Sequence, residues 1–468
     1  MFGSTLWLTL ATLTGLIAGF AREWLLVAAW GAGPRSDAFL VAVFLPEAIR
    51  MTLAAGLLAA AALPLYQQRD ERRQRAWLTG LTPGLFGLGL ALYAVLALAA
   101  PLLVRLVGPG LDSNVQVEAA TNLRWLAASV PGLLVHALFS IPLQARQRFV
   151  LPALGSLLFN LPPVLYLFWR GHASLSNELS MAFVAGSLLM CVPLLPPIWR
   201  SGWRPWHVRG EARAGRELLG RIGPLMVSNL ASQGLALLER LVSSYLGDGA
   251  VTWVNLARKL INLPLIALMS LNQVLLSLMS GNQGEQRLLL LRRGLDATTL
   301  LCLPAALGLV GASPALIHLL LPAQSAEGPL PALLGWFATP LVFGAWNAML
   351  ARYAYAAGDT RMPLNCELLG SLFNAILLAS LPMLLGLKGI ALAALGGVIL
   401  TNLLLMQRQQ LLTVLGWPIR WGLSVVLLGL AAVFLHPLLN TWLQLGLSTL
   451  AGLLSLCALG IWLKPWKS

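Results

Sequence analysis

Long apolar stretches alternate with short polar connections along almost the entire chain. A helix needs about 20 predominantly apolar residues to cross the hydrocarbon core of a bilayer. By this measure the pattern predicts an all-α polytopic membrane protein of about fourteen transmembrane helices. The predicted spans are residues 5–30, 37–65, 77–107, 121–144, 150–169, 179–199, 222–246, 250–280, 295–321, 329–356, 363–385, 387–407, 418–438 and 443–463.

Basic residues gather in every second connection, whereas the connections between them hold only Arg35, Arg170 and Lys388. The basic groups lie at residues 69–75, 146–148, 200–221, 287–293, 361, 408–420 and 464–467. Cytoplasmic loops of membrane proteins carry an excess of lysine and arginine. We therefore expect both termini in the cytoplasm.

The composition agrees with a chain that folds in lipid. Hydrophobic residues make up 58% of the sequence and charged residues 10%, whereas an ordinary soluble domain is about 25% charged. The net charge of +14 comes from basic residues in the predicted cytoplasmic connections. We therefore expect these residues to set the orientation in the membrane and to attract anionic head groups, and we expect no nucleic-acid partner. The first apolar segment lacks a basic start and a cleavage site, which predicts a retained helix.

The cysteines do not predict a metal site. Cys191, Cys302, Cys366 and Cys457 lie in separate apolar runs, and the histidines are scattered. No C-x-x-C motif or His/Cys spacing typical of metal ligands is present, so we expect neither disulfides nor a metal centre.

A weak internal repeat divides the chain. Leu154–Leu157 with the following Asn160 recurs as Leu369–Leu372 with Asn374. In a second register Arg22, Gly31 and Pro46 correspond to Arg240, Gly249 and Pro264. About six helices separate the copies, so the two halves insert with the same orientation, and a binding site is expected between such repeats near mid-depth.

This repeat predicts four parts of the chain. Residues 1–199 would form an N-lobe of six helices, 200–221 a basic cytoplasmic linker, and 222–412 a C-lobe of six helices. Residues 413–468 would add two helices whose apolar surface could accept a long lipid chain.

Four cations stand where apolar residues are expected: Arg22, Arg50, Arg258 and Lys259. A charge at the centre of a spanning helix costs about 2.5–3.5 kcal/mol on insertion scales, so it needs a partner, water or a ligand. Cations that converge on one cavity suit an anion, and the arginine fork suits phosphate oxygens. The alternative is that each cation pairs with a buried acid only to hold helices together.

Four acidic residues lie near these cations. Asp37 and Glu47 flank Arg50 along the chain, and could keep an empty cavity near neutrality or take up H⁺ or Na⁺. Glu23 beside Arg22 is a further candidate for ion coupling. Glu239 beside Arg240 is a candidate too, and is equally consistent with a structural pair.

At these residues the chain resembles the MurJ/MviN family of lipid II flippases, within the multidrug/oligosaccharidyl-lipid/polysaccharide exporter superfamily. The first matching block is Gly19–Glu23, Gly31–Gly33, Asp37–Phe39, Leu45–Pro46, Arg50, Gly56 and Pro64. A second block is Gly223–Pro224, Ser232–Gln233, Trp253, Ala257, Leu260 and Pro264. Weaker similarity covers Arg148–Phe149, Asn160 and Asp359–Pro363.

The resemblance implies two six-helix lobes, a central cationic cavity and two extra helices that form a groove for a lipid tail. Arg22, Asp37 and Arg50 would then line the cavity, with Arg22 and Arg50 at the pyrophosphate. Lys259, with Arg258 beside it, falls where the family usually has arginine. The chain departs from the pattern at Leu16, where the family commonly has arginine, and at Ala55, where it commonly has glutamate.

The function expected from this resemblance is translocation of an undecaprenyl-pyrophosphate-linked glycan from the inner to the outer leaflet of a bacterial cytoplasmic membrane. The glycan would be lipid II or a related oligosaccharide such as an exopolysaccharide repeat. No cofactor is expected, and coupling to the membrane potential, H⁺ or Na⁺ is open. Membrane lipids and cell-envelope glycan synthesis proteins are the other expected partners.

Three other classes of function stay open. A multidrug antiporter of the same superfamily would want an acidic, aromatic-lined cavity, whereas this interior leans basic. A membrane glycosyltransferase would need an acidic cluster in a surface loop, and the pair Asp70–Glu71 lies among arginines. An assembly partner without transport activity would share the same sequence features. ATP-driven pumping is disfavoured because the chain has no G-x-x-x-x-G-K-[ST] loop.

Overall fold

Every regular element in the described part of the computed structural model is a helix. The structure describes residues 2–52, 58–201, 203, 210–211, 213–321, 328–413, 417–438 and 440–463. Within them, ten helices are long and apolar enough to cross a membrane, and Ile419–Leu435 is a shorter apolar helix. The predicted all-α polytopic fold is confirmed.

Several predicted spans are interrupted at prolines. The predicted helix at 77–107 is two helices that meet at Ala99, two residues before Pro101. The predicted helix at 121–144 breaks at Ala128–Ser129, just before Pro131. Proline removes a backbone donor and restricts the residue before it, so a continuous apolar run can hold a break that its hydropathy does not reveal.

The chain divides into two compact units, Met1–Thr252 and Trp253–Ser468. The helices of the first unit are α1 (Phe2–Trp30), α2 (Pro34–Ile49), α3 (Leu58–Gln67), α4 (Glu71–Leu98), α5 (Ala100–Val107), α6 (Ser113–Ala127), α7 (Val130–Ala145), α8 (Val150–Arg170), α9 (Ser176–Leu189), α10 (Leu195–Arg200) and α11 (Ala214–Ser244). Short 3₁₀ turns, η2 (Gly171–Ala173) and η3 (Val192–Leu194), join some of them, and α12 (Ala250–Ser280) begins in the first unit.

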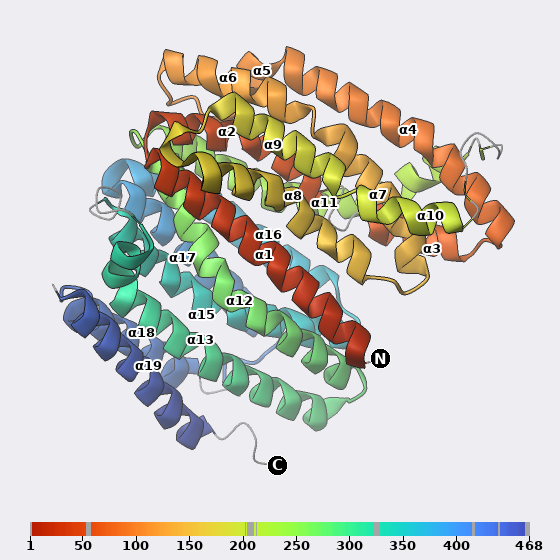
Figure 1. Cartoon of the computed structure of the whole chain (residues 1–468). Helices are drawn as coiled ribbons and strands as arrows, with labels where there is room; N and C mark the ends of the chain where they lie inside the picture. The colour runs from red at the N-terminus through yellow and green to blue at the C-terminus, as the bar shows by residue number, and fades with distance from the viewer. Residues whose placement is uncertain are drawn as a thin grey trace. The chain divides into compact units, whose positions relative to one another are not determined.

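In the first unit α1 lies along α8, and α8 lies along α9 (Figure 1). Small residues allow this close approach: a Cβ on Gly15 would come within 2.8 Å of the Ser156 side chain, and Gly186 faces the Phe159 carbonyl. Helices in membranes pack through such small-residue contacts because lipid provides little hydrophobic drive between them. This packing brings residues of α1 and α8 to one place.

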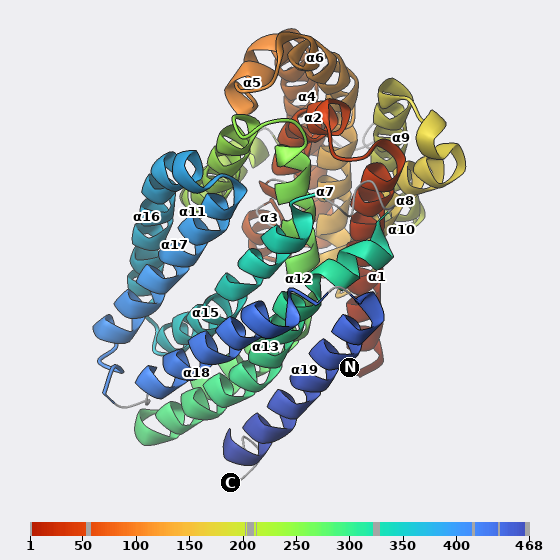
Figure 2. The same cartoon turned by 90° about the vertical axis from the view of Figure 1, so that its left-hand side faces the viewer.

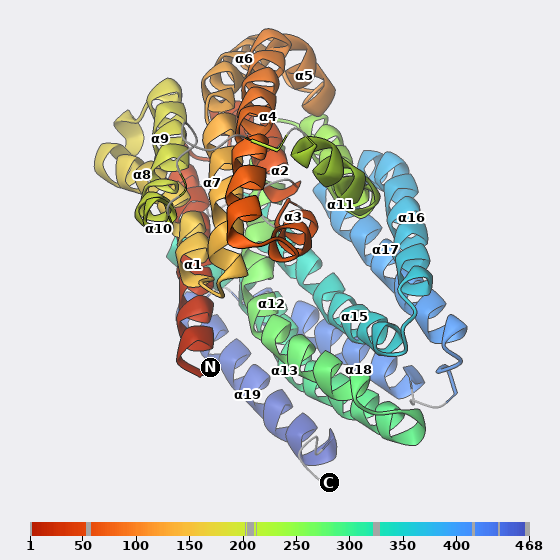
Figure 3. The same ribbon diagram turned by 90° about the vertical axis from the view of Figure 1, so that its right-hand side faces the viewer.

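A second part of the first unit contains α3, α4 and α7, which pack on one another (Figure 3). Its core includes Trp77 of α4, which is fully buried. Trp203 also belongs to this core, and its indole nitrogen donates to the Thr79 hydroxyl at 2.9 Å. The start of the predicted linker is therefore packed against α4 of the first unit.

The helices of the second unit are α13 (Gly284–Leu320), α15 (Leu330–Ala356), α16 (Arg361–Leu385), α17 (Leu387–Arg408), α18 (Trp417–Leu430) and α19 (Thr441–Leu463), with the π-helical turn η4 (Ala431–Leu435) after α18. Here α16 packs along α17, and α13 packs against both α15 and α19 (Figure 2). Gly370 and Gly397 lie at the contact between α16 and α17, where a Cβ on Gly397 would come within 2.6 Å of Asn374.

The two copies of the repeat motif occupy corresponding places in their own units. Asn160 of α8 and Asn374 of α16 are both buried, and each helix packs on the one that follows it. The compact units divide at Thr252, after α11, whereas the predicted lobes divide within 200–221. Residues 202, 204–209 and 212 of that linker lie outside the described residues, and the predicted division stays a prediction.

Candidate functional site

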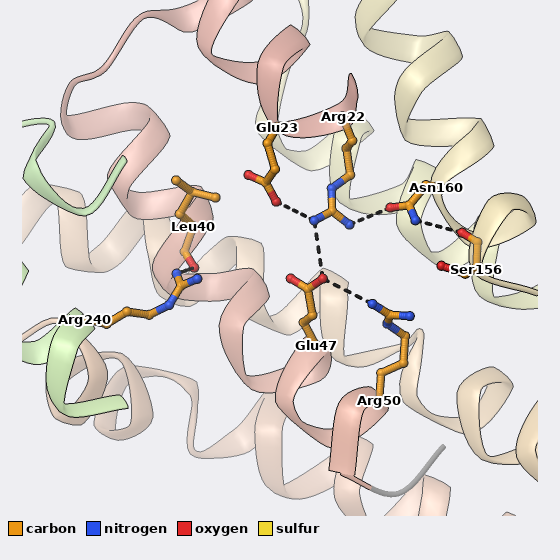
Figure 4. Close-up of polar contacts among 8 residues, drawn as sticks. All are labelled: Arg22, Glu23, Leu40, Glu47, Arg50, Ser156, Asn160 and Arg240. Atoms are coloured by element: carbon orange, nitrogen blue, oxygen red, sulfur yellow. Dashed lines mark hydrogen bonds and ion pairs between the residues drawn. The ribbon is translucent and has the colours of Figure 1, made fainter. Parts of the chain in front are cut away.

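The buried arginine of α1 is held by three side chains (Figure 4). Arg22 donates from Nη1 to the Asn160 amide oxygen at 2.8 Å. Its Nη2 lies 2.5 Å from a Glu23 carboxylate oxygen and 3.5 Å from Glu47 Oε1. The Asn160 amide nitrogen donates in turn to the Ser156 carbonyl at 2.8 Å, which fixes the orientation of the amide. Helices α1, α2 and α8 all contribute to this arrangement.

Glu47 joins Arg22 to the second predicted cation. Arg50 Nη2 lies 3.3 Å from Glu47 Oε1, the same oxygen that faces Arg22 (Figure 4). We call these five residues, Arg22, Glu23, Glu47, Arg50 and Asn160, the Arg22–Arg50 cluster. It contains two guanidinium groups and two carboxylates, so the formal charges balance. The structure thus brings together two of the predicted cations and two of the predicted coupling acids.

The cluster is sealed at one end and more open at the other. The side chains of Arg22 and Glu23 are each 3% exposed, whereas Glu47 is 17% and Arg50 14% exposed. Arg50 Nε is buried and has no hydrogen-bond partner. Arg50 therefore keeps a donor that a ligand with an acceptor oxygen could use.

Aromatic rings support both guanidinium groups. The Arg22 guanidinium carbon lies 4.9 Å from the ring centre of Phe183, and that of Arg50 lies 5.0 Å from the ring centre of Phe159. Cation–π contact stabilises a desolvated cation without neutralising it. The two phenylalanines also pack edge to face, with ring centres 5.6 Å apart.

The local backbone explains why Arg50 sits at an accessible point. Pro46 lies inside α2, and the α-helix gives way at residues 50–52 to a π-helical turn. Proline disturbs the hydrogen bonding of the preceding turn, and π-turns often occur at functional sites. The segment that follows, including Ala55 and Gly56, lies outside the described residues.

Asp37 is placed elsewhere, away from the cations with which the resemblance groups it. It is fully buried, and its carboxylate accepts from the backbone N–H groups of Gly249 at 2.7 Å and Thr252 at 2.8 Å. The Thr252 hydroxyl donates to it at 2.5 Å. These donors belong to the start of α12, so Asp37 caps the positive end of a helix. The arrangement supports a structural role for Asp37.

Glu239 and its neighbour Arg240 lie on α11, and both are largely buried. Arg240 donates to the Leu40 carbonyl of α2 at 2.5 Å (Figure 4). It also stacks on Phe44, with its guanidinium carbon 4.7 Å from the ring centre. Arg240 thus ties α11 to α2. Glu23 and Glu47 also act on it electrostatically.

Arg258 and Lys259 belong to the second unit and are both half-buried. The Arg258 guanidinium carbon lies 4.5 Å from the ring centre of Phe337 on α15. Their grouping with Arg22 and Arg50 in one site stays a prediction. Leu16, the place of a missing family arginine, lies in α1 and is 40% exposed.

Sequence reasoning did not include Asn160, Phe159 and Phe183 among the site residues. Asn160 did carry a signal, because it is a single polar residue in an apolar helix and recurs in the repeat. The phenylalanines carried none, since an aromatic residue in a membrane helix is unremarkable until a cation is found on its face. Among the described residues, no group of three or more His, Cys, Asp or Glu side chains could hold a metal ion.

The second unit also contains an apolar groove of about 430 Å³ formed by α13, α18, η4 and α19. Leu307, Phe434 and Leu454 are among its lining residues, and Ser455 is the one lining residue with a polar side chain. Gln444, which is almost fully buried, donates to the carbonyls of Leu435 and His436 at 3.0 and 2.9 Å. It therefore fixes the backbone where α18 ends in a π-helical turn.

Comparisons with known proteins agree on one family. The family model described as lipid II flippase MurJ matches residues 26–455. A probable lipid II flippase MurJ of Thermotoga maritima is 26% identical over 400 residues, covering 83% of this chain and 81% of that protein. Another, of Rhizobium tropici, is 26% identical over 408 residues and covers 82% of this chain and 76% of its own length.

Two solved structures share the fold. A lipid II flippase MurJ in an inward closed conformation matches with a TM-score of 0.85 at 20% identity, covering 98% of each chain. An inward-facing multidrug resistance MATE family transporter matches with a TM-score of 0.69 at 15% identity, covering 90% of this chain and 98% of the other.

Proposed function

We propose a function for this chain from its family, because it belongs to the MurJ family of lipid II flippases. The chain moves lipid II from the inner to the outer leaflet of the bacterial cytoplasmic membrane by alternating access. It is a multi-pass membrane transporter rather than an enzyme. In this role it would serve peptidoglycan synthesis, and the proteins that make and use cell-envelope glycans would be its neighbours.

The Arg22–Arg50 cluster is the observation that carries this proposal. Two guanidinium groups share one carboxylate oxygen, Glu47 Oε1, inside a helix bundle. Guanidinium groups bind phosphate oxygens strongly, and more so where water is scarce. Arg50 would be the principal ligand of the diphosphate because it is the more exposed cation and has an unused donor. The predicted role of Arg258 and Lys259 as further ligands of the diphosphate is part of the proposal.

The apolar groove of the second unit supports the same function. Its walls come from α13, α18, η4 and α19, and almost every lining side chain is apolar. Such a surface suits a polyprenyl chain, because apolar side chains offer it van der Waals contact and the chain has no polar group that would be left without a hydrogen bond. The predicted role of residues 413–468 in holding the lipid tail is part of the proposal.

The orientation of the termini is also part of the proposal. Basic residues favour the cytoplasmic side, which would place both termini there. Transfer of a cation down the membrane potential, worth about 2.3 kcal/mol per charge per 100 mV, could then return the unloaded site to the inner face. H⁺ or Na⁺ could act through Glu23, Glu47 or Glu239.

A related cargo is the second candidate. Leu16 leaves an apolar, half-exposed side chain where the family commonly has arginine. One cation fewer keeps a diphosphate site but changes what surrounds the sugar, which fits another undecaprenyl-pyrophosphate-linked oligosaccharide. Measuring the transport rates of lipid II and of such an oligosaccharide with the same purified protein would show which of the two is its cargo.

The test replaces Arg50 by alanine in the full chain, reconstituted in vesicles with lipid II. We expect at least a tenfold loss of lipid II appearing in the opposite leaflet, measured with an enzyme that reaches only that leaflet. The matched control is Arg124→Ala, which removes an exposed arginine from α6 of the same unit and should leave transport unchanged. Normal transport by a correctly inserted Arg50→Ala protein would overturn the site assignment.

A further inference from the structure

The bridge made by Glu47 has the geometry of a bound anion. One carboxylate oxygen lies 3.5 Å from Arg22 Nη2 and 3.3 Å from Arg50 Nη2, so a single negative group serves two guanidinium groups on different helices (Figure 4). A phosphate oxygen would satisfy the same pair of donors. Glu47 therefore stands where the phosphate of a bound headgroup would be expected.

The contacts within the cluster differ in length and burial. Arg22 is held at 2.5 Å by Glu23 and at 2.8 Å by Asn160. The contacts of Glu47 with the two arginines are longer than both. An ion pair at 3.3–3.5 Å lacks the short geometry of a strong charge-assisted hydrogen bond. The contacts of Glu47 are thus easier to replace than those of Glu23.

The exposed fractions of the side chains also identify Glu47 as the acid that an incoming group would meet. Glu47 and Arg50 form the more exposed end of the cluster, whereas Arg22 and Glu23 are 3% exposed. An incoming anion would meet Glu47 and Arg50 before it could reach Arg22. If Glu47 moved aside, the Nη2 atoms of Arg22 and Arg50 would lose their shared carboxylate oxygen and could bind the incoming group, while Glu23 and Asn160 kept Arg22 in position.

We propose that Glu47 is an internal competitor of the substrate diphosphate. It neutralises Arg22 and Arg50 while the site is empty, gives way when the diphosphate of the lipid-linked glycan binds, and promotes release by returning to both guanidinium groups. The proposal rests on the flippase function proposed above and adds a regulatory residue to the same site.

The charges in the cluster explain why Glu47 should weaken binding of the diphosphate. In the empty site two guanidinium groups face the carboxylates of Glu23 and Glu47. A diphosphate diester brings a negative charge on each phosphate, so the two guanidinium groups of the Arg22–Arg50 cluster would face the phosphates as well as both carboxylates in a poorly solvated place. Repulsion between the diphosphate and the displaced carboxylate weakens binding. Weaker binding favours transport, because a substrate that is held too tightly cannot leave.

The experiment replaces Glu47 by glutamine, which keeps the size of the side chain and removes its charge. Binding of undecaprenyl diphosphate to the full chain in nanodiscs would be measured by native mass spectrometry, and lipid II turnover in vesicles. We expect the Kd of Glu47→Gln to fall about tenfold and its turnover to fall severalfold. A merely structural role would not move binding and turnover in these directions.

Two further variants make the result decisive. Glu23→Gln removes the same charge from the sealed end and leaves the Glu47 bridge, so we expect it to tighten binding less than Glu47→Gln. Glu47→Asp keeps the charge on a shorter side chain that cannot span both arginines, so we expect intermediate tightening. Glu47→Asp decides the question if Glu47→Gln fails to fold.

The outcomes separate the two proposals. Unchanged or weaker binding by the Glu47 variants, with wild-type binding that Arg50→Ala abolishes, would overturn the competitor role alone. Equal tightening by Glu23→Gln and Glu47→Gln would also overturn it, because general charge would then explain the effect. A wild-type protein that does not bind undecaprenyl diphosphate would overturn both.

Discussion

At the scale of single residues, Asn160 shows how this chain keeps a charged group inside a membrane helix bundle. Its amide oxygen accepts from Arg22 Nη1 at 2.8 Å, and its amide nitrogen donates to Ser156 one turn earlier. The amide is thereby oriented toward the cation. A buried donor that loses its acceptor bears the full cost of desolvation, so Arg22 depends on this residue.

Replacing Asn160 by alanine should therefore destabilise the protein by about 1.5–3 kcal/mol, the range for hydrogen bonds to charged groups. Thermal unfolding of the purified protein in detergent would report the loss. The matched control is Asn374→Ala in the second copy of the repeat motif, where the amide oxygen is buried without a hydrogen-bond partner. The interpretation of Asn160 fails if both variants lower the Tm equally.

At the scale of helices, close approach through glycine determines which side chains meet. Gly186 of α9 lies directly against the Phe159 carbonyl of α8, so a side chain there would collide with backbone. The same contact places Phe183 beside Phe159, and these rings face the two arginines of the cluster. The packing of α8 on α9 thus supports the site indirectly.

We expect Gly186→Ala to cost about 1–3 kcal/mol, as overpacking does in a well-packed core. Gly84→Ala in α4 is the matched control, because nothing lies within 4 Å of its Cβ position. Alanine is the better helix former, so that variant should be neutral or slightly stabilising. Thermal unfolding would measure both, and a neutral Gly186→Ala would show that α8 and α9 can separate without cost.

At the scale of the whole molecule, the positions of basic residues predict the orientation in the membrane. Arg148 lies between α7 and α8, in a connection predicted to be cytoplasmic, and His172 lies in the η2 turn after α8, predicted to be outside. A basic segment is costly to move across the membrane against the potential, so these two connections should differ in exposure.

Alkaline phosphatase, which is active only outside the cytoplasm, would test this orientation. A fusion that ends after His172 should be active, and one that ends after Arg148 should be inactive. A green fluorescent protein fused after Ser468 should fluoresce, because it folds in the cytoplasm. The reverse pattern of phosphatase activity would invert the proposed topology.

The linker shows how the first unit extends beyond its predicted six helices. Arg69 lies 2.5 Å from a Glu217 carboxylate oxygen and 3.5 Å from Glu211. The Glu211 backbone N–H also donates to the Ala76 carbonyl at 3.0 Å. The sequence pattern had suggested only a basic connection there. The acids that pair with Arg69 are over a hundred residues away along the chain, so no local pattern could reveal them.

The sequence by itself determined the helical class, the approximate spans and the identity of the buried cations. It could do so because the length of an apolar run, and the presence of a charged residue within it, are local properties of the sequence. The length can be compared with the known thickness of the hydrocarbon core, and the charge with the known cost of burying it. Only the tertiary structure decided which acid serves which purpose. Asp37 and Glu47 lie ten residues apart on the same helix, yet one caps α12 and the other bridges two arginines. The different roles of Asp37 and Glu47 depend on how α1, α8 and the start of α12 pack around α2. Which side chains pair across packed helices is set by distances in space, and these cannot be read from the order of residues along the chain.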